Sequence, residues 1–322
     1  MDPMKYRKKR KTTHRSTSKK QSRFPALVLT VLLLTALFAF PITRQYLSQL
    51  LSSVFPQTEQ ENTANGDDIL SVHFIDVGQG DSILLLCGGE AAVIDGGGRE
   101  AGETVSSYLQ EQGVQQLKYI FCTHSHEDHC GGLSQVLEDY PTQAVYCSSS
   151  QYDSRSFHRF VQSAAEQNAP VTVPPTGSSY SLGSAVLTLL GPREDFEEIN
   201  DQSLVLRLDH GYISMLFTGD LTRAGEKSLL ESNCDLNVDL LKVGHHGSNT
   251  SSSYEFLWNV MPRYAVISVG AGNSYGHPHE EVLSRLTDAR AEIYRTDLQG
   301  SIVVLSDGKD LYFQTERSFS EE

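Results

Sequence analysis

Cysteine and tryptophan are scarce in this chain, whose 322 residues include five cysteines and one tryptophan. An odd number of cysteines without a regular spacing does not indicate a disulfide framework. Cys87, Cys122 and Cys147 lie in apolar, strand-like runs, and we expect them to pack as small hydrophobic side chains. A fold held together by disulfides is therefore disfavoured.

Basic residues are scarce beyond residue 44. Residues 1–44 hold 11 of the 26 lysines and arginines but only 1 of the 40 acidic residues, so the rest of the chain carries 15 basic and 39 acidic residues, a formal charge of −24. Such a surface repels polyanions unless a basic patch or a bound metal overrides it locally. Tight, non-specific binding to duplex nucleic acid is therefore disfavoured.

Charged residues are absent from residues 24–42, FPALVLTVLLLTALFAFPI, a run long enough for one transmembrane helix. The basic tail at residues 1–23 and the few Lys or Arg just after the run predict a cytoplasmic N-terminus. We therefore expect a single-pass membrane protein whose remaining residues are extracytoplasmic. A cleaved signal peptide is the alternative, although small residues are poorly placed for cleavage around Ala36 to Pro41.

The remainder divides by composition. Residues 43–67 are predicted to be a polar linker, residues 68–315 one globular domain, and residues 316–322 a tail. Within the domain, apolar β-type runs alternate with amphipathic segments, and strands followed by mixed β/α units occur twice. This order predicts two sheets packed together with helices outside. Strands are predicted at 71–77, 82–87, 91–94, 117–122, 144–147, 185–190, 203–208, 212–217, 238–243, 264–269, 292–295 and 301–305, and helices at 104–112, 133–139, 154–167, 223–230, 254–260 and 280–288.

Histidines are concentrated in THSHEDHCGG, residues 123–132, which directly follows a predicted strand. Imidazole and carboxylate together suit Zn, Mn or Fe rather than Mg or Ca. On an extended backbone His124 and His126 point the same way, while Asp128 and His129 follow on a tight turn and can face a second ion. A helix would scatter these side chains, so the cluster is predicted to lie on a loop. The alternative is a surface loop that is merely rich in histidine.

Three further predicted strands end in residues that can bind metals. Asp95 follows one strand in IDGGG, Asp220 follows another in FTGD, and His245 and His246 follow a third in KVGHHGS. With the histidine cluster these residues suffice for two ions and leave a carboxylate free to bridge them. Asp220 is predicted to be a ligand, and Asp95 to orient the histidine-bearing loop through hydrogen bonds.

The motifs HSHEDH, VIDGGG, TGD and HHGS resemble those of the metallo-β-lactamase fold superfamily. This resemblance implies an α/β fold, a four-layer αββα sandwich. One branch is especially similar, the extracellular hydrolase domain of ComEC-type competence proteins and their stand-alone relatives. That likeness covers residues 69–306 and rests on FIDVGQGDS, NDQSLVLRL, LKVGHHGS, YGHPHEEVLSRL and RTDLQGSI.

The chain departs from the superfamily pattern in one ligand. Many members place a further histidine between the cluster and the TGD aspartate, whereas here only His158 and His210 lie between, and both are expected at the surface. The first ion would then be bound by His124, His126 and Asp220. The second would be bound by Asp128, His129, Asp220 and one of the pair His245 and His246. We favour His246 as that ligand, with His245 facing the substrate.

A single predicted span also excludes a DNA-translocation pore.

The resemblance implies a metal-dependent hydrolase, specifically a phosphodiesterase or nuclease with two Zn or Mn ions and a metal-activated water. Asp128 or Asp220 could accept the water proton, and His277 could hold a phosphate oxygen or protonate the leaving group. The substrate would be single-stranded nucleic acid or a small ester, and no protein partner can be inferred. The alternative is a hydrolase of small or wall-linked esters, such as a phosphocholine-type phosphodiester or a lactone. Supporting or substrate-contacting roles are expected for Asp76, Gln79, Asp81, Asp95, Asn200, Ser203 and His279.

Overall fold

The computed structural model describes residues 68–318. The predicted basic tail, the predicted spanning segment at residues 24–42 and the predicted linker all lie outside the described residues. Within 68–318, no helix has both the length and the apolar character needed to cross a bilayer.

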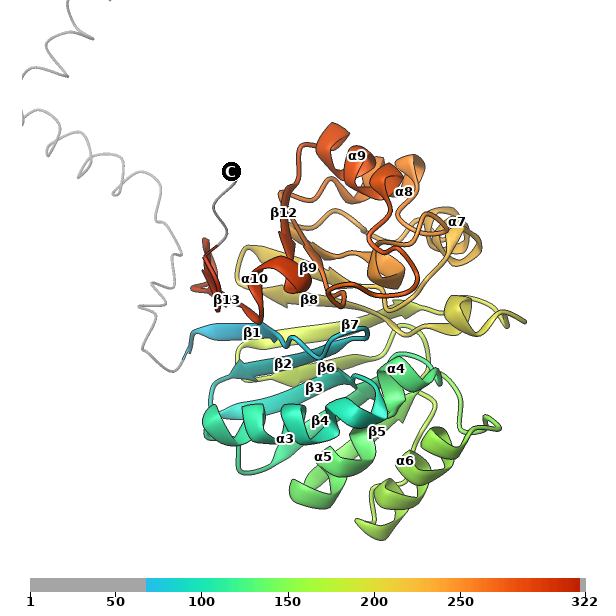
Figure 1. The fold of residues 1–322 in the computed structure, drawn as a ribbon, viewed down its shortest axis with the longest axis vertical. Helices are drawn as coiled ribbons and strands as arrows, with labels where there is room; N and C mark the ends of the chain where they lie inside the picture. The colour runs from blue at the N-terminus through green and yellow to red at the C-terminus, as the bar shows by residue number, and fades with distance from the viewer. Residues whose placement is uncertain (1–67, 319–322) are drawn as a thin grey trace, which may run out of the picture. The chain divides into compact units, whose positions relative to one another are not determined.

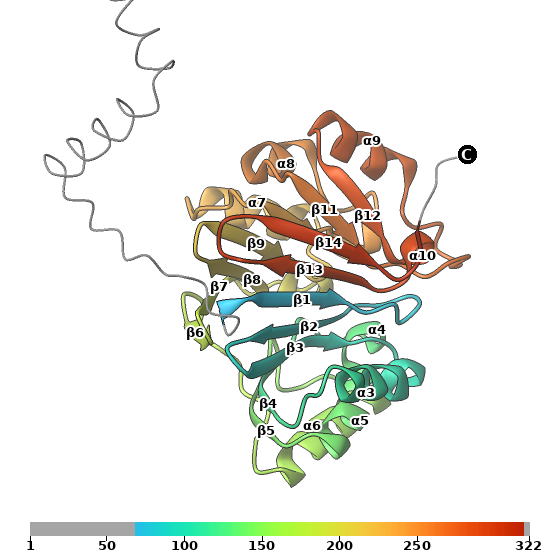
Figure 2. The ribbon, with the colours of Figure 1, turned by 90° about the vertical axis from the view of Figure 1, so that its left-hand side faces the viewer.

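Two mixed seven-stranded sheets form the centre of the domain (Figure 1). The first sheet has the strand order β14 (Leu311–Thr315), β13 (Ile302–Ser306), β1 (Leu70–Phe74), β2 (Ser82–Cys87), β3 (Glu90–Gly96), β4 (Leu117–Cys122) and β5 (Thr142–Cys147). The second has the order β12 (Glu292–Arg295), β11 (Tyr264–Ile267), β10 (Leu240–Lys242), β9 (Ile213–Phe217), β8 (Val205–His210), β7 (Ala185–Gly191) and β6 (Ser179–Leu182). In Figure 2, β13 lies between β1 and β14, so the last two described strands extend the sheet to which the first described strand belongs.

Helices cover the outer face of each sheet. α3 (Gly102–Glu111), α5 (Leu133–Asp139) and α6 (Arg155–Glu166) pack on the first sheet, and α7 (Arg223–Glu231), α8 (Tyr254–Val260) and α9 (Glu280–Asp288) on the second (Figure 1). Alternation along β2 shows why its sequence is continuously apolar. Ile83 and Leu85 face the core between the sheets, whereas Leu84 faces the helices. The predicted arrangement of two sheets with helices outside is therefore confirmed.

Short helices connect the strands at the edge where the candidate metal ligands gather. They are η2 (Arg99–Ala101), α4 (Glu127–Cys130), η3 (Ile199–Gln202), η4 (Gly244–Gly247) and α10 (Thr296–Gln299). One of them corrects a prediction, because Asp128 and His129 lie on the single turn of α4 rather than on a loop. The His126 carbonyl accepts a hydrogen bond from Cys130 N at 2.9 Å and so begins this turn. A single turn places the two side chains on neighbouring faces without scattering them further.

Two strands and one histidine also differ from the predictions. β6 and β14 were not predicted; both are short strands at the edges of their sheets, where only one neighbouring strand pairs with them. His210 was expected at the surface but is buried, with Nδ1 2.9 Å from Ser306 Oγ, because the end of β8 packs beneath β13. His158 is exposed on α6 as expected. All five cysteines are free, and Cys87, Cys122 and Cys147 are buried in the cores.

Candidate metal centre

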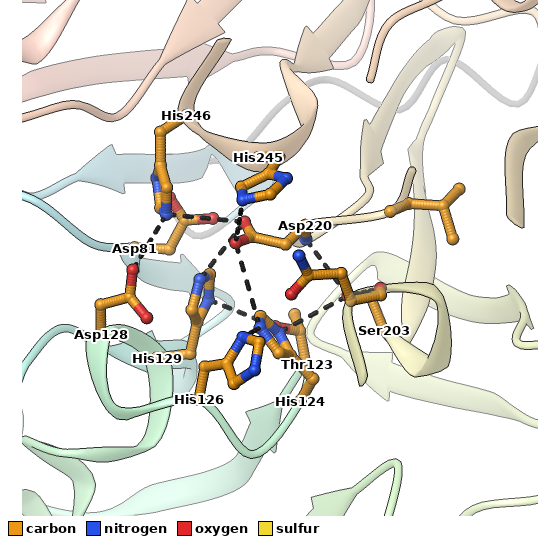
Figure 3. A network of polar contacts seen from close by, with 12 residues as sticks. Asp81, Thr123, His124, His126, Asp128, His129, Ser203, Asp220, His245 and His246 are labelled. Carbon is orange, nitrogen blue, oxygen red and sulfur yellow. Dashed lines mark hydrogen bonds and ion pairs between the residues drawn. The ribbon is translucent and has the colours of Figure 1, made fainter. Parts of the chain in front are cut away.

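Asp220 lies at the centre of a cluster of imidazoles (Figure 3). Its Oδ1 lies 3.3 Å from His129 Nε2 and 3.5 Å from His246 Nε2. Its Oδ2 lies 3.6 Å from His245 Nε2 and 4.0 Å from His124 Nε2. Two ligand atoms bound at about 2.0–2.1 Å to one tetrahedral ion lie roughly 3.3 Å apart. Each oxygen of Asp220 therefore faces its own pair of imidazoles at a spacing close to that of ligands around an ion.

On one side of Asp220, four candidate ligands lie close enough together to bind one ion. Single atoms of Asp128, His129, Asp220 and His246 all lie within 4.8 Å of one another, and Asp128 Oδ2 is 3.4 Å from His246 Nε2. Among the described residues, His129 Nε2, Asp220 Oδ1 and His246 Nε2 are buried polar atoms without a hydrogen-bond partner. An unpaired buried polar atom costs about 1–3 kcal/mol. A divalent cation placed among these atoms would satisfy all of them, so the residues present fit a metal ion.

On the other side of Asp220, the candidate ligands lie farther apart. His124 Nε2 lies 3.1 Å from His126 Nδ1 and 4.0 Å from Asp220 Oδ2. His245 reaches the same oxygen from the opposite direction. Within residues 68–318, however, His124 and His126 do not belong to a group of three ligand atoms as compact as the four-residue set. Asp220 brings the two sides together.

Hydrogen bonds fix which nitrogen of each imidazole is free. The Thr123 hydroxyl donates to Asp95 Oδ2 at 2.7 Å, so the 3.1 Å contact from His124 Nδ1 must be a donation to Thr123. Asp95 Oδ2 also accepts from His129 Nδ1 at 2.9 Å. In the same way, His246 Nδ1 donates to the Ser268 carbonyl at 3.0 Å. Nε2 of all three rings is left for a ligand, which is the usual arrangement around metal-binding histidines.

The charges of the cluster set its protonation. Burial alone would lower the pKa of His246, but Asp220 and Asp81 outweigh it and raise the pKa to about 10. Asp220 and Asp95 likewise raise the pKa of His129 well above its usual value in spite of burial. Metal ligands must be deprotonated, so an ion bound here displaces protons from both rings.

Burial favours the neutral form of three other imidazoles, those of His124, His245 and His277. Burial lowers the pKa of His124 and of His245. Burial and the neighbouring imidazoles lower the pKa of His277 to about 4. A neutral His277 can donate a hydrogen bond but is a weak proton donor.

Three residues of the cluster and its support have a strained, left-handed backbone conformation. Asp95, His245 and His246 have φ values of 58°, 51° and 52°. A non-glycine residue in this left-handed region costs on the order of 1–3 kcal/mol and persists only where its surroundings determine it. The consecutive pair in η4 directs both imidazoles toward Asp220 (Figure 3).

Two glycines allow the motif loops to approach one another. Gly80 has a φ of 141°, and a Cβ there would lie 2.5 Å from the Asp128 carbonyl oxygen. Gly219 has a φ of 51°, and its Cβ would lie 2.9 Å from Thr123 and Ser203. The glycines of GQGDS and TGD are therefore required by close approach and by backbone conformation.

An ion pair that the sequence analysis missed lies beneath the cluster. Lys242 Nζ is 2.8 Å from Asp81 Oδ2, and both side chains are buried. Asp81 Oδ1 in turn lies 3.3 Å from His246 Nδ1. Burial would raise the pKa of Asp81, but Lys242 and His246 lower it to about 2. A lysine inside the apolar run LLKV was the available signal, because a strand covered on both faces rarely carries an unpaired charge.

The other expected residues divide between the cluster and its surroundings. Asn200 and Gln79 line the cavity beside the cluster, and Ser203 Oγ accepts from Asp220 N at 3.1 Å. Asp76 is not at the cluster, since it pairs with Arg317 at 2.7 Å. His279 precedes α9, and its Nδ1 accepts from Asn249 N at 3.0 Å, so it supports the loop after η4.

Comparison with known proteins agrees with this geometry. The sequence profile of the metallo-beta-lactamase superfamily matches residues 75–270. The chain belongs to the metallo-beta-lactamase superfamily. The likeness extends to ComE operon protein 3 of Bacillus subtilis, 30% identical over 72% of this chain, and to competence protein ComA of Neisseria gonorrhoeae, 33% identical over 77%. These relatives confirm the resemblance to ComEC-type competence proteins that the motifs indicated.

The chain spans only about a third of those relatives, 32% and 33% of their lengths. Among solved structures, the metallo-beta-lactamase fold protein YhfI from Bacillus subtilis is similar, with a TM-score of 0.50 and 13% identity over 74% of this chain and 100% of that one. This last likeness concerns the fold alone. Superfamily membership and the His/Asp cluster together support a metal-dependent hydrolase.

Proposed function

We propose that this protein is a metal-dependent phosphodiesterase whose His/Asp cluster around Asp220 would hold two Zn or Mn ions. The observation that carries the proposal is the division of the Asp220 oxygens between two sets of imidazoles. Two-metal sites are used by phosphatases, polymerases and nucleases, and also by aminopeptidases, so such a site is compatible with phosphodiester chemistry. The relative named as a competence protein favours a nucleic-acid substrate.

The ligands follow from the contacts. One ion would be held by Asp128, His129, His246 and Asp220 Oδ1. The other would be held by His124, His126 and Asp220 Oδ2. His245 would complete this second set, since it lies as near to Oδ2 as His246 lies to Oδ1.

The cavity beside the cluster, about 430 Å³, has the chemistry for one phosphodiester group. Bound divalent ions supply Lewis acidity toward a phosphoryl oxygen and lower the pKa of water. Asp128 is half-buried on the cavity wall, where its carboxylate can accept a proton from the attacking water. His277 also lines the cavity, and its neutral ring can donate a hydrogen bond to a phosphoryl oxygen.

The test is hydrolysis by the metal-reconstituted protein of four substrates side by side: single-stranded DNA, bis-p-nitrophenyl phosphate, a phosphocholine ester and nitrocefin. We expect cleavage of single-stranded DNA and of bis-p-nitrophenyl phosphate, and no cleavage of nitrocefin. Asp128→Ala should lose both its metal and its activity. Cleavage of the phosphocholine ester alone would favour the hydrolysis of small or wall-linked esters. No hydrolysis of any substrate by protein that holds two ions would overturn the proposal.

His277→Ala separates two roles for that side chain. We expect it to keep its metal, measured by elemental analysis, and to lose about 10²–10³-fold in kcat, as when one donor to a developing oxyanion is removed. The loss should be equal for diesters with good and poor leaving groups, because a donor to the phosphoryl oxygen acts on both. A loss confined to poor leaving groups would instead make His277 the general acid. The matched control is His158→Ala, an exposed histidine on α6.

We also propose that residues 24–42 anchor this domain to the membrane with the hydrolase outside the cytoplasm. The support is the uncharged run after a strongly basic tail. Protease added to spheroplasts should digest the domain. Its protection in intact spheroplasts would contradict this placement.

A further inference from the structure

Tyr275 is an exposed aromatic side chain at the edge of the metal centre. It lines the same cavity as Asp220, His245 and His277, yet 65% of its surface is exposed. Single exposed aromatic side chains are common on protein surfaces, so what distinguishes Tyr275 is its position on the wall of this cavity. The function proposed above assigns this ring no role.

The ring is held in place rather than free to move. It stacks on His277, with the ring centroids 5.6 Å apart and the planes 21° apart. Asn273 fixes the backbone on both sides, because its Oδ1 accepts from Tyr275 N and His277 N, each at 3.1 Å. Its Nδ2 donates to the Gly270 and His277 carbonyls at 2.9 and 2.7 Å. A ligand that stacks here therefore meets a preorganised surface.

Tyr152, the other tyrosine that lines the cavity, has less exposed aromatic surface. Its ring is half-buried and meets His126 and Phe157 edge to face, with interplanar angles of 67° and 88°. Tyr275 thus presents the more open aromatic surface beside the cluster.

The cavity has no cation of its own for a nucleic-acid backbone. No lysine or arginine of the described chain lines it, whereas Glu127, Asp128 and Asp220 do. Proteins that bind single strands usually combine a basic groove with aromatic stacking. Here bound metal ions can balance one phosphodiester, and any further affinity has to come from contacts other than charge.

We propose that Tyr275 is a stacking subsite for a nucleobase attached to the phosphodiester in the metal centre. The inference rests on the proposed phosphodiesterase function and names what that site recognises. It favours short single strands and strand ends, whose bases can unstack, over duplexes.

The test compares two esters that share a leaving group, thymidine 5′-(p-nitrophenyl phosphate) and methyl p-nitrophenyl phosphate. In the metal-loaded protein, Tyr275→Ala should lower kcat/KM for the thymidine ester roughly 5- to 150-fold, mainly through KM, as expected for the loss of one stacked base. For the methyl ester, kcat/KM of Tyr275→Ala should differ from that of the wild type by less than about twofold. Tyr275→Phe keeps an aromatic ring and should change kcat/KM by less than about twofold for both esters. Tyr212→Ala removes a more exposed tyrosine, 86% against 65%, that does not line the cavity, and it serves as the control.

Two outcomes would overturn the subsite: an equal fall for both esters, or no fall for either. If wild-type protein hydrolyses neither ester, the phosphodiesterase proposal fails, and calorimetric binding then tests the subsite alone. Metal-loaded protein should bind thymidine 5′-methyl phosphate more tightly than dimethyl phosphate, and Tyr275→Ala should abolish that preference. Equal binding of the two ligands by the wild-type protein would contradict the subsite in that case.

Discussion

Asp220→Ala should remove most of the bound metal and nearly all hydrolysis. Within residues 68–318, Asp220 is the side chain that faces both sets of imidazoles, so in the proposed centre its loss would take a ligand from each ion at once. Loss of an outer hydrogen-bonding partner of a ligand typically weakens metal binding about 10–100-fold. Loss of a shared ligand should cost more than 100-fold at each position. Elemental analysis and metal titration of the purified variant measure both quantities.

Asp195→Ala is the matched control, because Asp195 is an exposed aspartate outside the cluster. It should keep two ions and full activity. Retention of two tightly bound ions by Asp220→Ala would show that Asp220 is not shared between them, and would remove the main support for the two-ion centre.

Lys242→Met should strongly destabilise the protein. Lys242 and Asp81 form a fully buried pair, and removing one partner of such a pair costs about 3–5 kcal/mol, because the other charge is left uncompensated. His246 lies beside Asp81 and should limit the loss to the lower part of that range. Urea unfolding of the metal-free variant against the metal-free wild type measures the free energy of unfolding.

The double variant Lys242→Met/Asp81→Asn should recover part of the lost stability, since it leaves no unpaired carboxylate. Lys227→Met serves as the control, because Lys227 is exposed and forms only a surface pair with Glu231. A loss below about 1 kcal/mol for Lys242→Met would mean that the pair adds little over an apolar contact.

The strands and the long helices could be predicted because each carries a periodic pattern that its packing requires. β2 is apolar on both faces since both are covered, and α6 starts where the Ser154 side chain accepts from Phe157 N. The single turn of α4 could not be predicted in this way. Its formation depends on the extended His126 before it and on the glycines after it, and four residues are too few for a period.

The candidate ligands could be named from residue type and position at strand ends, but their grouping could not. Which oxygen of Asp220 faces which imidazole depends on the packing of one sheet against the other, to which no local pattern refers. The support of His246 by Asp81 and Lys242 is of the same kind. Asp81 lies 165 positions from His246 and 161 from Lys242, and it precedes a strand of the first sheet, whereas Lys242 belongs to the second. The ligand assignments themselves stay predictions until metal is measured.

The left-handed backbone of His245 and His246 has a cost in stability at two positions whose side chains the metal centre uses. Glycine at position 245 would relax the backbone and spare the fold about 1 kcal/mol, while deleting an imidazole. At position 246 glycine would also remove a buried ring that pairs with Asp81 and Asp220, so no gain in stability is expected there. Selection for thermal stability alone would therefore favour glycine at position 245 and remove a side chain of the metal centre. Engineering a thermostable form should leave these two positions fixed and seek its gains on the outer faces of the helices.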